Sequence, residues 1–533
     1  MRTVKDAFFD VARELGLTTI FGNPGSTEET MLKDFPEDFT YILGLQEAVV
    51  IAMADAYSQI HRAPVLVNLH TSAGTGNAMG NIETAFHNRT PLIITAGQQT
   101  REMLLMEAYL TNTDPTNIVK PFAKWAYQPQ RPEDVPGALM RAYAMAVLPP
   151  AGPVYLSLPM DDFDKPYKGM PEIRKVSKRL PADKNSLKEL IAAINVARNP
   201  LLVFGGAIDH HEGSWQQAVT FAEKLRAPVF AGPKEGRACF PENHPLYQGS
   251  LKSSIAHLKE QLEGFDLVIV MGAPVFRYYP FVAGEILPEG TKLFQISDDA
   301  QEIARAPVGT GILADPGYAC EVLAHEIGTH NRKDPRPQKR APAPEKKSLI
   351  TPEYLFHVVE SLKPKESIIV EESPSTSSVQ EAQIKTTEPL SFLSMCSGVL
   401  GFGLAGAVGA AIAEREIGTN RKVIALIGDG SANYVIQALW TAAQLKLPIC
   451  FIILKNKSYN VLKSFADQQN APGVPGLDLP GMDFVSLAKG YGMEGSSVRH
   501  PEILKDHLTT CFSLNEPHLV EVYTDPEVPD LLG

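Results

Sequence analysis

The stretch Arg421–Ser458, RKVIALIGDGSANYVIQALWTAAQLKLPICFIILKNKS, decides the fold. It opens with a continuous apolar run, Val423–Ile427. A second run, Ile449–Leu454, follows a segment, Tyr434–Leu445, whose apolar residues recur three and four positions apart. Short, wholly apolar strands around an amphipathic helix are typical of a βαβ unit in a parallel sheet that is buried on both faces. The stretch therefore predicts an α/β fold.

Polar residues follow each apolar run at the point where the predicted strand ends. Asp429 follows the first run, and Asn456 and Ser458 follow the second. Because ligands of parallel sheets bind beyond the carboxyl ends of the strands, we expect these side chains to lie close together. A carboxylate, an amide oxygen and a hydroxyl suit Mg²⁺, which completes its coordination with water and phosphate oxygens.

The residues around Asp429 predict a phosphate site at the same edge. Gly428 and Gly430 let a phosphate approach the backbone, and Ser431 opens a helix whose free N–H groups attract anions. The alternative is that Gly428-Asp429-Gly430 forms only a tight turn, as Asp-Gly pairs often do. The second strand, which ends at Asn456 at βαβ spacing, favours the cation and phosphate site.

Length and composition describe an ordinary globular protein of several domains. The chain has 533 residues, 44% of them hydrophobic and 21% charged, which predicts about three domains. The net charge of −12 and the lack of a basic cluster argue against nucleic acid as a partner. No apolar run is long enough for a membrane span, and the N-terminal helix lacks the apolar core of a signal peptide. We expect a cytoplasmic protein.

The cysteines favour the same compartment. There are five, scattered and without a CxxC pair, so we expect buried or incidental thiols in a reducing environment. They are Cys239, Cys320, Cys396, Cys450 and Cys511.

Alternating helical and apolar-strand patterns divide the chain into three α/β domains with largely parallel sheets flanked by helices. We place them at residues 1–180, 185–330 and 350–533, with a linker rich in proline and charge at 331–349. The second domain carries Gly205-Gly206 after its first strand but lacks the full dinucleotide fingerprint, so we expect a structural layer there.

Three residues of the first domain could do chemistry. Ser26 ends an Asn-Pro-Gly-Ser turn after one strand, His70 ends another strand, and Glu47 begins an apolar helix. Each has a structural explanation, since turn serines are common and a carboxylate near a helix N-terminus is a favourable dipole partner. Ser26 and His70 nevertheless fall on the edge that should face a ligand, and histidine suits proton transfer near neutral pH.

The motifs together resemble one enzyme family. The GDG segment followed by Asn456, with FGNPGS, NLHTSAGTGNAMG, PLIITAGQQT, GAPVFRY, IGDGSANY and PGLDLPGMDF in this order, resembles the thiamine-diphosphate-dependent 2-keto acid decarboxylases. Within that family the chain is most similar to the benzoylformate decarboxylase branch, over nearly its whole length. The resemblance implies pyrimidine-binding, middle and diphosphate-binding domains in chain order.

The resemblance also implies thiamine diphosphate and Mg²⁺ as cofactors. Asp429, Asn456 and Ser458 would hold Mg²⁺ on the diphosphate, and Leu400 would lie beneath the bend of the cofactor. The full set of cofactor-binding residues would be Asn23, Pro24, Gly25, Gly398, Leu400, Gly428, Gly430, Ser431 and Tyr459.

By the same resemblance Glu47 would hydrogen-bond the aminopyrimidine and activate the cofactor. Ser26 would bind the substrate carboxylate and His70 would act as acid or base on the keto oxygen. Tyr279, Leu462 and Phe465 would wall the substrate pocket.

The chain departs from the family at two positions of the site. Tyr279 stands where the family's decarboxylases have a second histidine, and Pro374 stands where the family has a hydroxyl residue near the cofactor. The unperturbed pKa of a tyrosine, about 10, makes it a poor proton shuttle at pH 7. The substrate is therefore less firmly predicted than the decarboxylase chemistry.

We expect decarboxylation of an aromatic or bulky 2-keto acid, such as benzoylformate, to an aldehyde and CO₂. The alternatives are a carboligase like acetohydroxyacid synthase, which Tyr279 would favour, and a homologue that has lost catalysis. A nicotinamide dehydrogenase is disfavoured because the dinucleotide fingerprint is absent. The resemblance further implies a homo-oligomer, usually a dimer of dimers, in which Glu47 and Asp429 of one site come from different chains.

Overall fold

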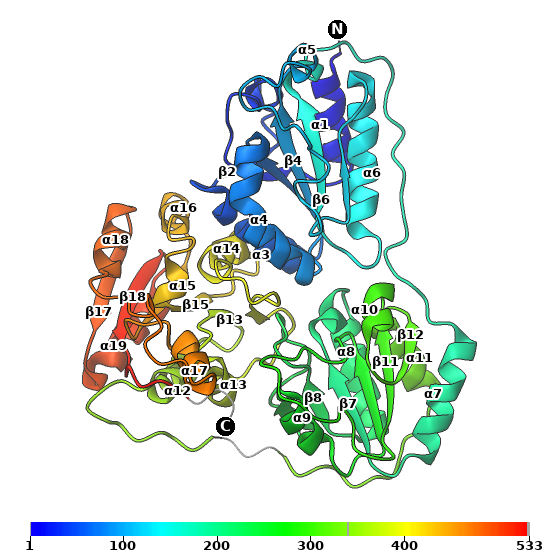
Figure 1. Ribbon diagram of the computed structural model, residues 1–533, viewed down its shortest axis with the longest axis vertical. Coiled ribbons are helices and arrows are strands. Elements are labelled where there is room, and N and C mark those ends of the chain that lie inside the picture. The colour runs from blue at the N-terminus through cyan, green and yellow to red at the C-terminus, as the bar shows by residue number, and fades with distance from the viewer. Residues whose placement is uncertain (1, 338–340, 530–533) are drawn as a thin grey trace.

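The computed structural model describes residues 2–337 and 341–529. They form three six-stranded sheets, and every strand pair within them is parallel. Figure 1 shows the three α/β lobes, coloured blue to cyan, green, and yellow to red along the chain. The fold class predicted from the apolar runs is confirmed.

The first sheet has the strand order β2-β1-β3-β4-β6-β5. Its strands are β1 (Thr19–Gly22), β2 (Thr40–Leu43), β3 (Val65–Leu69), β4 (Leu92–Gln98), β5 (Trp125–Tyr127) and β6 (Val154–Pro159). The helices of this lobe are α1 (Val4–Glu14), α2 (Glu29–Leu32), α3 (Glu47–His61), α4 (Thr71–His87), α5 (Arg101–Leu104) and α6 (Val135–Val147). Strands β3 and β4 are buried along their whole length, which is why they are continuous apolar runs.

The middle sheet has the order β12-β11-β10-β7-β8-β9. Its strands are β7 (Pro200–Phe204), β8 (Val229–Ala231), β9 (Tyr247–Ser250), β10 (Leu267–Met271), β11 (Lys292–Ser297) and β12 (Thr310–Leu313). Its helices are α7 (Lys184–Val196), α8 (Ser214–Leu225), α9 (Ile255–Leu262), α10 (Ala300–Arg305) and α11 (Pro316–Glu326). The predicted linker at 331–349 contains residues 338–340, which lie outside the described residues.

The third sheet has the order β14-β13-β15-β16-β18-β17. Its strands are β13 (Ile368–Glu372), β14 (Phe392–Leu393), β15 (Val423–Gly428), β16 (Ile449–Lys455), β17 (Glu494–Val498) and β18 (His518–Tyr523). Its helices are α12 (Pro352–Leu362), α13 (Ser377–Gln383), α14 (Gly403–Ile417), α15 (Asp429–Ala432), α16 (Ala438–Gln444), α17 (Asn460–Gln468), α18 (Phe484–Gly490) and α19 (Pro501–Ser513).

The strands β15 and β16 of the opening stretch pair directly, with Gly428 opposite Leu454. The connection between them differs from the prediction. Residues 434–445 do not form one helix. The short helix α15 follows β15, and two turns lie between it and α16. In these turns the N–H groups of Tyr434 and Ala438 donate to the carbonyls of Ser431 and Val435. These turns bond three residues back, so they interrupt the regular helical pattern that the spacing of apolar residues predicted.

Helices α3 and α14 join the first and third lobes (Figure 1). A Cβ atom on Gly409 of α14 would overlap the carbonyl of Met53 in α3, so only glycine allows this approach. Toward the C-terminal ends of the two helices, the Tyr57 hydroxyl of α3 donates to Glu416 of α14 at 2.5 Å. The helices therefore run in parallel, with both N-termini at the same side.

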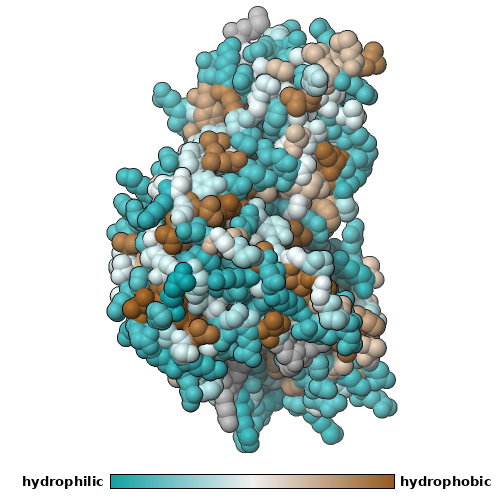
Figure 2. Space-filling view, turned by 60° about the vertical axis from the view of Figure 1, so that its left-hand side comes forward, coloured by the Kyte–Doolittle hydropathy of each residue, from teal (hydrophilic) through white to brown (hydrophobic). Residues whose placement is uncertain are grey.

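The surface of the molecule is mainly hydrophilic, with apolar patches scattered over the face in Figure 2. Within residues 2–337 and 341–529, even the most apolar helices fall short of what a bilayer span requires.

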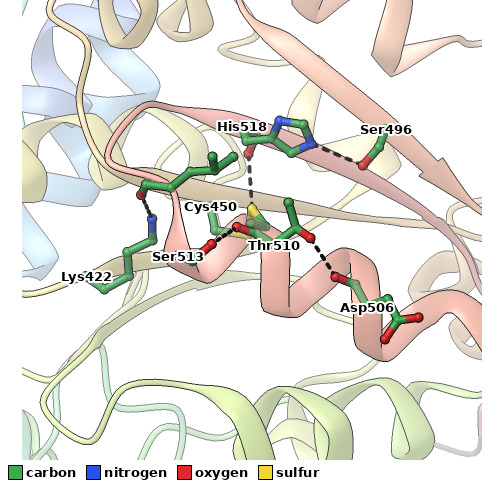
Figure 3. Close-up of a disulfide and its surroundings, with 9 residues drawn as sticks. Lys422, Cys450, Ser496, Asp506, Thr510, Ser513 and His518 are labelled. Atoms are coloured by element: carbon green, nitrogen blue, oxygen red, sulfur yellow. Dashed lines mark hydrogen bonds between the residues drawn. A yellow bond between two sulfur atoms is a disulfide. The ribbon is translucent and has the colours of Figure 1, made fainter.

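A disulfide joins Cys450 of β16 to Cys511 of α19. In Figure 3 it lies between that strand and the helix that carries Thr510 and Ser513. The prediction of five thiols is therefore wrong for two cysteines, while Cys239, Cys320 and Cys396 are free. The pair escaped prediction because it is 61 residues apart in sequence and comes together only where α19 packs on the sheet.

The number of thiols tests this pairing. We expect three of the five cysteines to react with an alkylating reagent in the unfolded, unreduced protein, and all five after reduction. Replacing Cys450 and Cys511 together by serine should lower the thermal midpoint, because a crosslink across a loop of this length contributes about 4 kcal/mol in the chain-entropy treatment. Intact-mass spectrometry after alkylation gives the count. Five reactive thiols before reduction would contradict the disulfide.

Candidate active site

The first rim of the candidate site is formed by the ends of β1 and β3, which are neighbours in the first sheet. The turn with Asn23, Pro24, Gly25 and Ser26 follows β1, and His70 precedes α4. A Cβ atom on Gly25 would overlap the His70 ring, so the glycine lets the turn lie against the imidazole. Ser26 is exposed beside it. The predicted proximity of the turn and the histidine is thus observed.

Glu28 holds the imidazole and was not predicted from the sequence. Its Oε2 lies 2.9 Å from Nδ1 of His70 and accepts the N–H of Gly25 at 2.8 Å. Its Oε1 accepts the N–H of Gly97 at 2.7 Å. The side chain is buried, and a buried carboxylate fixes the ring nitrogen that it meets. The signal available in the sequence was a carboxylate shortly after a strand-end turn, which also fits a solvated loop residue.

Glu47 is the first residue of α3 and is 7% exposed. Its two carboxylate oxygens accept hydrogen bonds from two amide side chains, Nδ2 of Asn23 and Nδ2 of Asn77, each at 3.0 Å. Asn77 was also not predicted. Because a buried carboxylate is costly unless it is hydrogen-bonded, these amides keep Glu47 in place and leave it able to accept a further donor.

The second rim lies at the ends of β15 and β16. Asp429 accepts the N–H of Gly430 at 2.9 Å through one oxygen and the N–H of Lys457 at 2.7 Å through the other. Asn456 accepts the N–H of Ser458 at 2.9 Å. The predicted oxygen ligands are therefore on adjoining segments. The Ser458 hydroxyl donates to the Leu477 carbonyl at 3.0 Å, so it would offer a cation a lone pair.

The chemistry of this second rim fits a divalent cation and a phosphate. Asp429 is buried, burial raises its pKa to about 6, and no lysine or arginine forms a salt bridge with it among the described residues. A Cβ atom on Gly430 would overlap the Tyr459 ring, so this position must be glycine. Gly428 ends the strand and Asp429 begins α15, where Ser431 is buried. The segment is thus more than a tight turn.

A third segment, between β14 and α14, contains Gly398 and Leu400. Gly398 and Gly401 have φ values of +79° and +115°, which L side chains rarely adopt. Leu400 is half-buried between them. The glycines thus give this loop a shape that places one bulky residue next to the start of α14.

Three family descriptions cover most of the chain. Residues 2–118 match the N-terminal TPP binding domain of thiamine pyrophosphate enzymes, residues 187–324 the central domain, and residues 375–522 the C-terminal TPP binding domain. The chain belongs to the thiamine-diphosphate-dependent enzymes. The family predicted from the motifs is confirmed, and the two rims and the segment of Leu400 lie within the matched TPP binding domains.

Relatives within the family are similar over their full length. Benzoylformate decarboxylase from Pseudomonas aeruginosa is 44% identical over 99% of this chain and 100% of its own. The crystal structure of benzoylformate decarboxylase from Polynucleobacter necessarius is 44% identical, with a TM-score of 0.97 and coverage of 99% and 100%. A 4-hydroxybenzoylformate decarboxylase from Rhodococcus jostii is 41% identical, with a TM-score of 0.95 and the same coverage.

In this thiamine-diphosphate-dependent enzyme the predicted pocket residues come from two lobes. The rings of Tyr279, from the middle lobe, and Phe465, from α17, meet edge to face with centroids 5.1 Å apart. Leu462 lies three residues before Phe465 on the same helix and is partly exposed. Tyr279 itself is 56% exposed. The structure thus brings Tyr279 and Phe465 together, as expected for one wall of a pocket.

The two rims do not meet through hydrogen bonds. In the part of the chain that the structure describes, no hydrogen bond joins Glu47 or His70 to Asp429 or Asn456. Ser26 and Tyr279 both face solvent. Within a single chain the residues predicted for one site are therefore not joined by direct hydrogen bonds, although Asn81 bonds both the Ala48 and the Gly401 carbonyls.

The middle lobe carries its own carboxylate at the Gly205-Gly206 turn. Glu235 accepts the N–H of Gly206 at 2.7 Å and forms an ion pair with Arg277 at 2.8 Å. The backbone N–H that could meet a phosphate is thus already bonded within the protein.

The contact between Gly430 and Tyr459 can be tested by substitution. We expect Gly430→Ala to displace the Tyr459 ring and to weaken thiamine diphosphate binding by the apoenzyme by roughly five- to a hundred-fold, since overpacking a tight site costs ~1–3 kcal/mol. Fluorescence titration with the cofactor and Mg²⁺ measures the affinity. Gly490→Ala is the control, because a Cβ there meets no atom within 4 Å. Equal affinities for both variants would show that the contact is unimportant for the cofactor.

Proposed function

We propose that this chain is a thiamine-diphosphate- and Mg²⁺-dependent decarboxylase of an aromatic 2-keto acid, with benzoylformate as its first candidate substrate. The observation that carries the proposal is the first rim, where a buried Glu47 held by two amides lies in the same lobe as an imidazole held by Glu28. The full-length similarity to enzymes named benzoylformate and 4-hydroxybenzoylformate decarboxylase supports the substrate class.

The second rim would hold the cofactor's diphosphate. Asp429, Asn456 and Ser458 would coordinate Mg²⁺, and Gly428, Gly430 and Ser431 would face the phosphates. Thiamine diphosphate supplies a nucleophilic carbon and an electron sink for the bond to CO₂. The buried carboxylate of Asp429 favours a cation because no basic side chain of the described residues neutralises it at contact distance.

The first rim would handle protons and the substrate carboxylate. Glu47 would exchange a proton with the aminopyrimidine ring, and the amides that hold it would keep its oxygens directed there. His70 would give or take a proton at the keto oxygen through Nε2, because Nδ1 faces Glu28. Ser26, exposed beside the imidazole, would bind the carboxylate of the keto acid.

A carboligase is the second candidate, and Tyr279 favours it. Its phenol stands where the resemblance places a histidine, so the two side chains differ as proton donors. If protonation after loss of CO₂ is slow, a second carbonyl compound can react at that stage. Such an enzyme would join two carbonyl compounds instead of releasing an aldehyde.

We also propose that the site is completed by a second copy of the chain, in a dimer of dimers. Ser26 and Tyr279 are exposed, and Leu105 and Tyr109, in the segment that follows β4 at the first rim, are 94% and 95% exposed. Burial of such apolar surface favours association. Glu47 of one chain would then face Asp429 of another.

Neither nucleic acid nor membrane is proposed as a partner. A cytoplasmic location stays a prediction, and the disulfide weakens the cysteine argument for it.

Product analysis tests the reaction. With thiamine diphosphate and Mg²⁺ supplied, we expect benzoylformate to give benzaldehyde and CO₂ in equal amounts, and a panel of aliphatic and aromatic keto acids to show preference for aromatic ones. The aldehyde and CO₂ are measured together, with and without added acetaldehyde. Consumption of keto acid that yields mainly hydroxyketone would favour the carboligase, and absence of CO₂ from every keto acid would reject the proposal.

The pairing of Glu28 with His70 gives a prediction of its own. We expect Glu28→Gln to lower kcat on the preferred keto acid by about ten- to a hundred-fold, since the amide holds the ring less firmly, while cofactor affinity stays unchanged. Glu47→Gln is the matched comparison, and it should instead suppress exchange of the cofactor's C2 proton. A Glu28→Gln enzyme with full kcat would mean that the carboxylate only supports the fold.

A further inference from the structure

The backbone of Gly401, which follows Leu400, is hydrogen-bonded on both sides of its Cα atom. Its N–H donates to Oε1 of Glu372 at 2.7 Å, and its carbonyl accepts Nδ2 of Asn81 at 3.0 Å. Glu372 ends β13 of the third lobe, whereas Asn81 lies on α4 of the first lobe. The two lobes thus hold the two successive peptide groups of Gly401, a residue with φ of +115° that only glycine adopts easily.

Glu372 is a buried carboxylate, 1% exposed, without a salt bridge to any lysine or arginine of the described residues. Its second oxygen accepts the N–H of Gly403, the first residue of α14. Burial raises the pKa of this group to about 7. The backbone N–H donors stabilise this buried carboxylate, which would otherwise be costly to bury. The carboxylate in turn fixes the backbone that donates to it, because charge-assisted hydrogen bonds are stronger than neutral ones.

Asn81 connects the same backbone to the start of α3. Its Nδ2 also donates to the carbonyl of Ala48, next to Glu47, at 2.9 Å. The side chain is 3% exposed, and its Oδ1 has no hydrogen-bond partner among the described residues. An unsatisfied buried oxygen costs about 1–3 kcal/mol. What this asparagine adds over an apolar residue is its two hydrogen bonds, to the carbonyls of Ala48 and Gly401.

We propose that Glu372 and Asn81 are positioning residues that fix the Gly401 backbone and so hold Leu400 against the bound cofactor. The proposal rests on the function proposed above, in which Leu400 lies beneath the bend of thiamine diphosphate. A catalytic group or its support that shifts by about 1 Å loses much of its effect, which is why a rigid peptide is valuable here. The simpler alternative is that Glu372 only caps α14.

Glu371 provides a matched control for Glu372. It is the preceding residue of β13, is 4% exposed, and bonds Ser373, Ser377 and Ser394 instead of the Gly401 loop. For Asn81 the control is Asn88, the buried C-cap of the same helix, which donates to Asp55 and accepts the N–H of Cys396 at 3.1 Å, five residues before Gly401. Each control removes comparable buried hydrogen bonds but leaves the Gly401 backbone untouched.

The experiment compares Glu372→Gln with Glu371→Gln, and Asn81→Ala with Asn88→Ala, in the holoenzyme. Exchange of the C2 proton of bound thiamine diphosphate is followed by quenched deuterium exchange and NMR, together with cofactor affinity and the thermal midpoint. We expect Glu372→Gln and Asn81→Ala to slow the exchange at least about ten-fold, and both controls to stay within about two-fold of the natural enzyme. All four variants should lower the midpoint to a similar degree.

The outcomes separate the two proposals. Normal exchange in Glu372→Gln and Asn81→Ala, with a lowered midpoint, would overturn the positioning role and leave a helix cap. If Glu372→Gln fails to fold, Asn81→Ala decides alone. A natural enzyme that exchanges the C2 proton but releases no CO₂ from any keto acid would reject the proposed reaction, while the four variants would still test the role of the Gly401 backbone.

Discussion

The close approach of α3 and α14 is the constraint on which the rest of the site depends. Gly409 lies so near the Met53 carbonyl that no side chain fits between the helices. Because the helices run in parallel, their N-termini meet at one side of the molecule. Glu47 begins one helix and the Leu400 loop leads into the other. A single backbone contact thus sets where the helix of Glu47 and the helix after the Leu400 loop begin.

Buried carboxylates recur around this contact, and each is held in a similar way. Glu28, Glu372 and Asp429 accept backbone N–H groups, and Glu47 accepts two side-chain amides. None of them pairs with a lysine or arginine among the described residues. Because fixed N–H and amide dipoles stabilise these carboxylates, a ligand that binds to them does not have to displace a lysine or arginine. The arrangement therefore favours cations and proton donors, which is what a magnesium diphosphate and an aminopyrimidine provide.

The sequence predicted the parts of this arrangement that depend on local pattern. The apolar runs Val423–Ile427 and Ile449–Leu454 located β15 and β16 to within one residue, and the strand ends located Asp429, Asn456 and His70 at the carboxyl ends of their sheets. Residues whose role depends on distant partners were not predictable. Glu28 acts through His70 and Gly97, Asn81 acts through Gly401, and Cys450 bonds Cys511. These partners come into contact only after the sheets form, so no spacing in the sequence predicts the contacts.

Tyr279 shows why chemistry and substrate choice can change separately in this fold. Its ring meets Phe465 across the junction of the middle and third lobes, and its backbone N–H donates to the Ser253 carbonyl at 2.9 Å. None of these contacts involves Glu28, Glu47, Glu372 or Asp429. Under the proposed function, a tyrosine at this position alters the size of the pocket wall while Glu28, Glu47, Glu372 and Asp429 keep their partners. Selection for a new keto acid would act on this exposed wall, because changes there leave the buried hydrogen bonds intact.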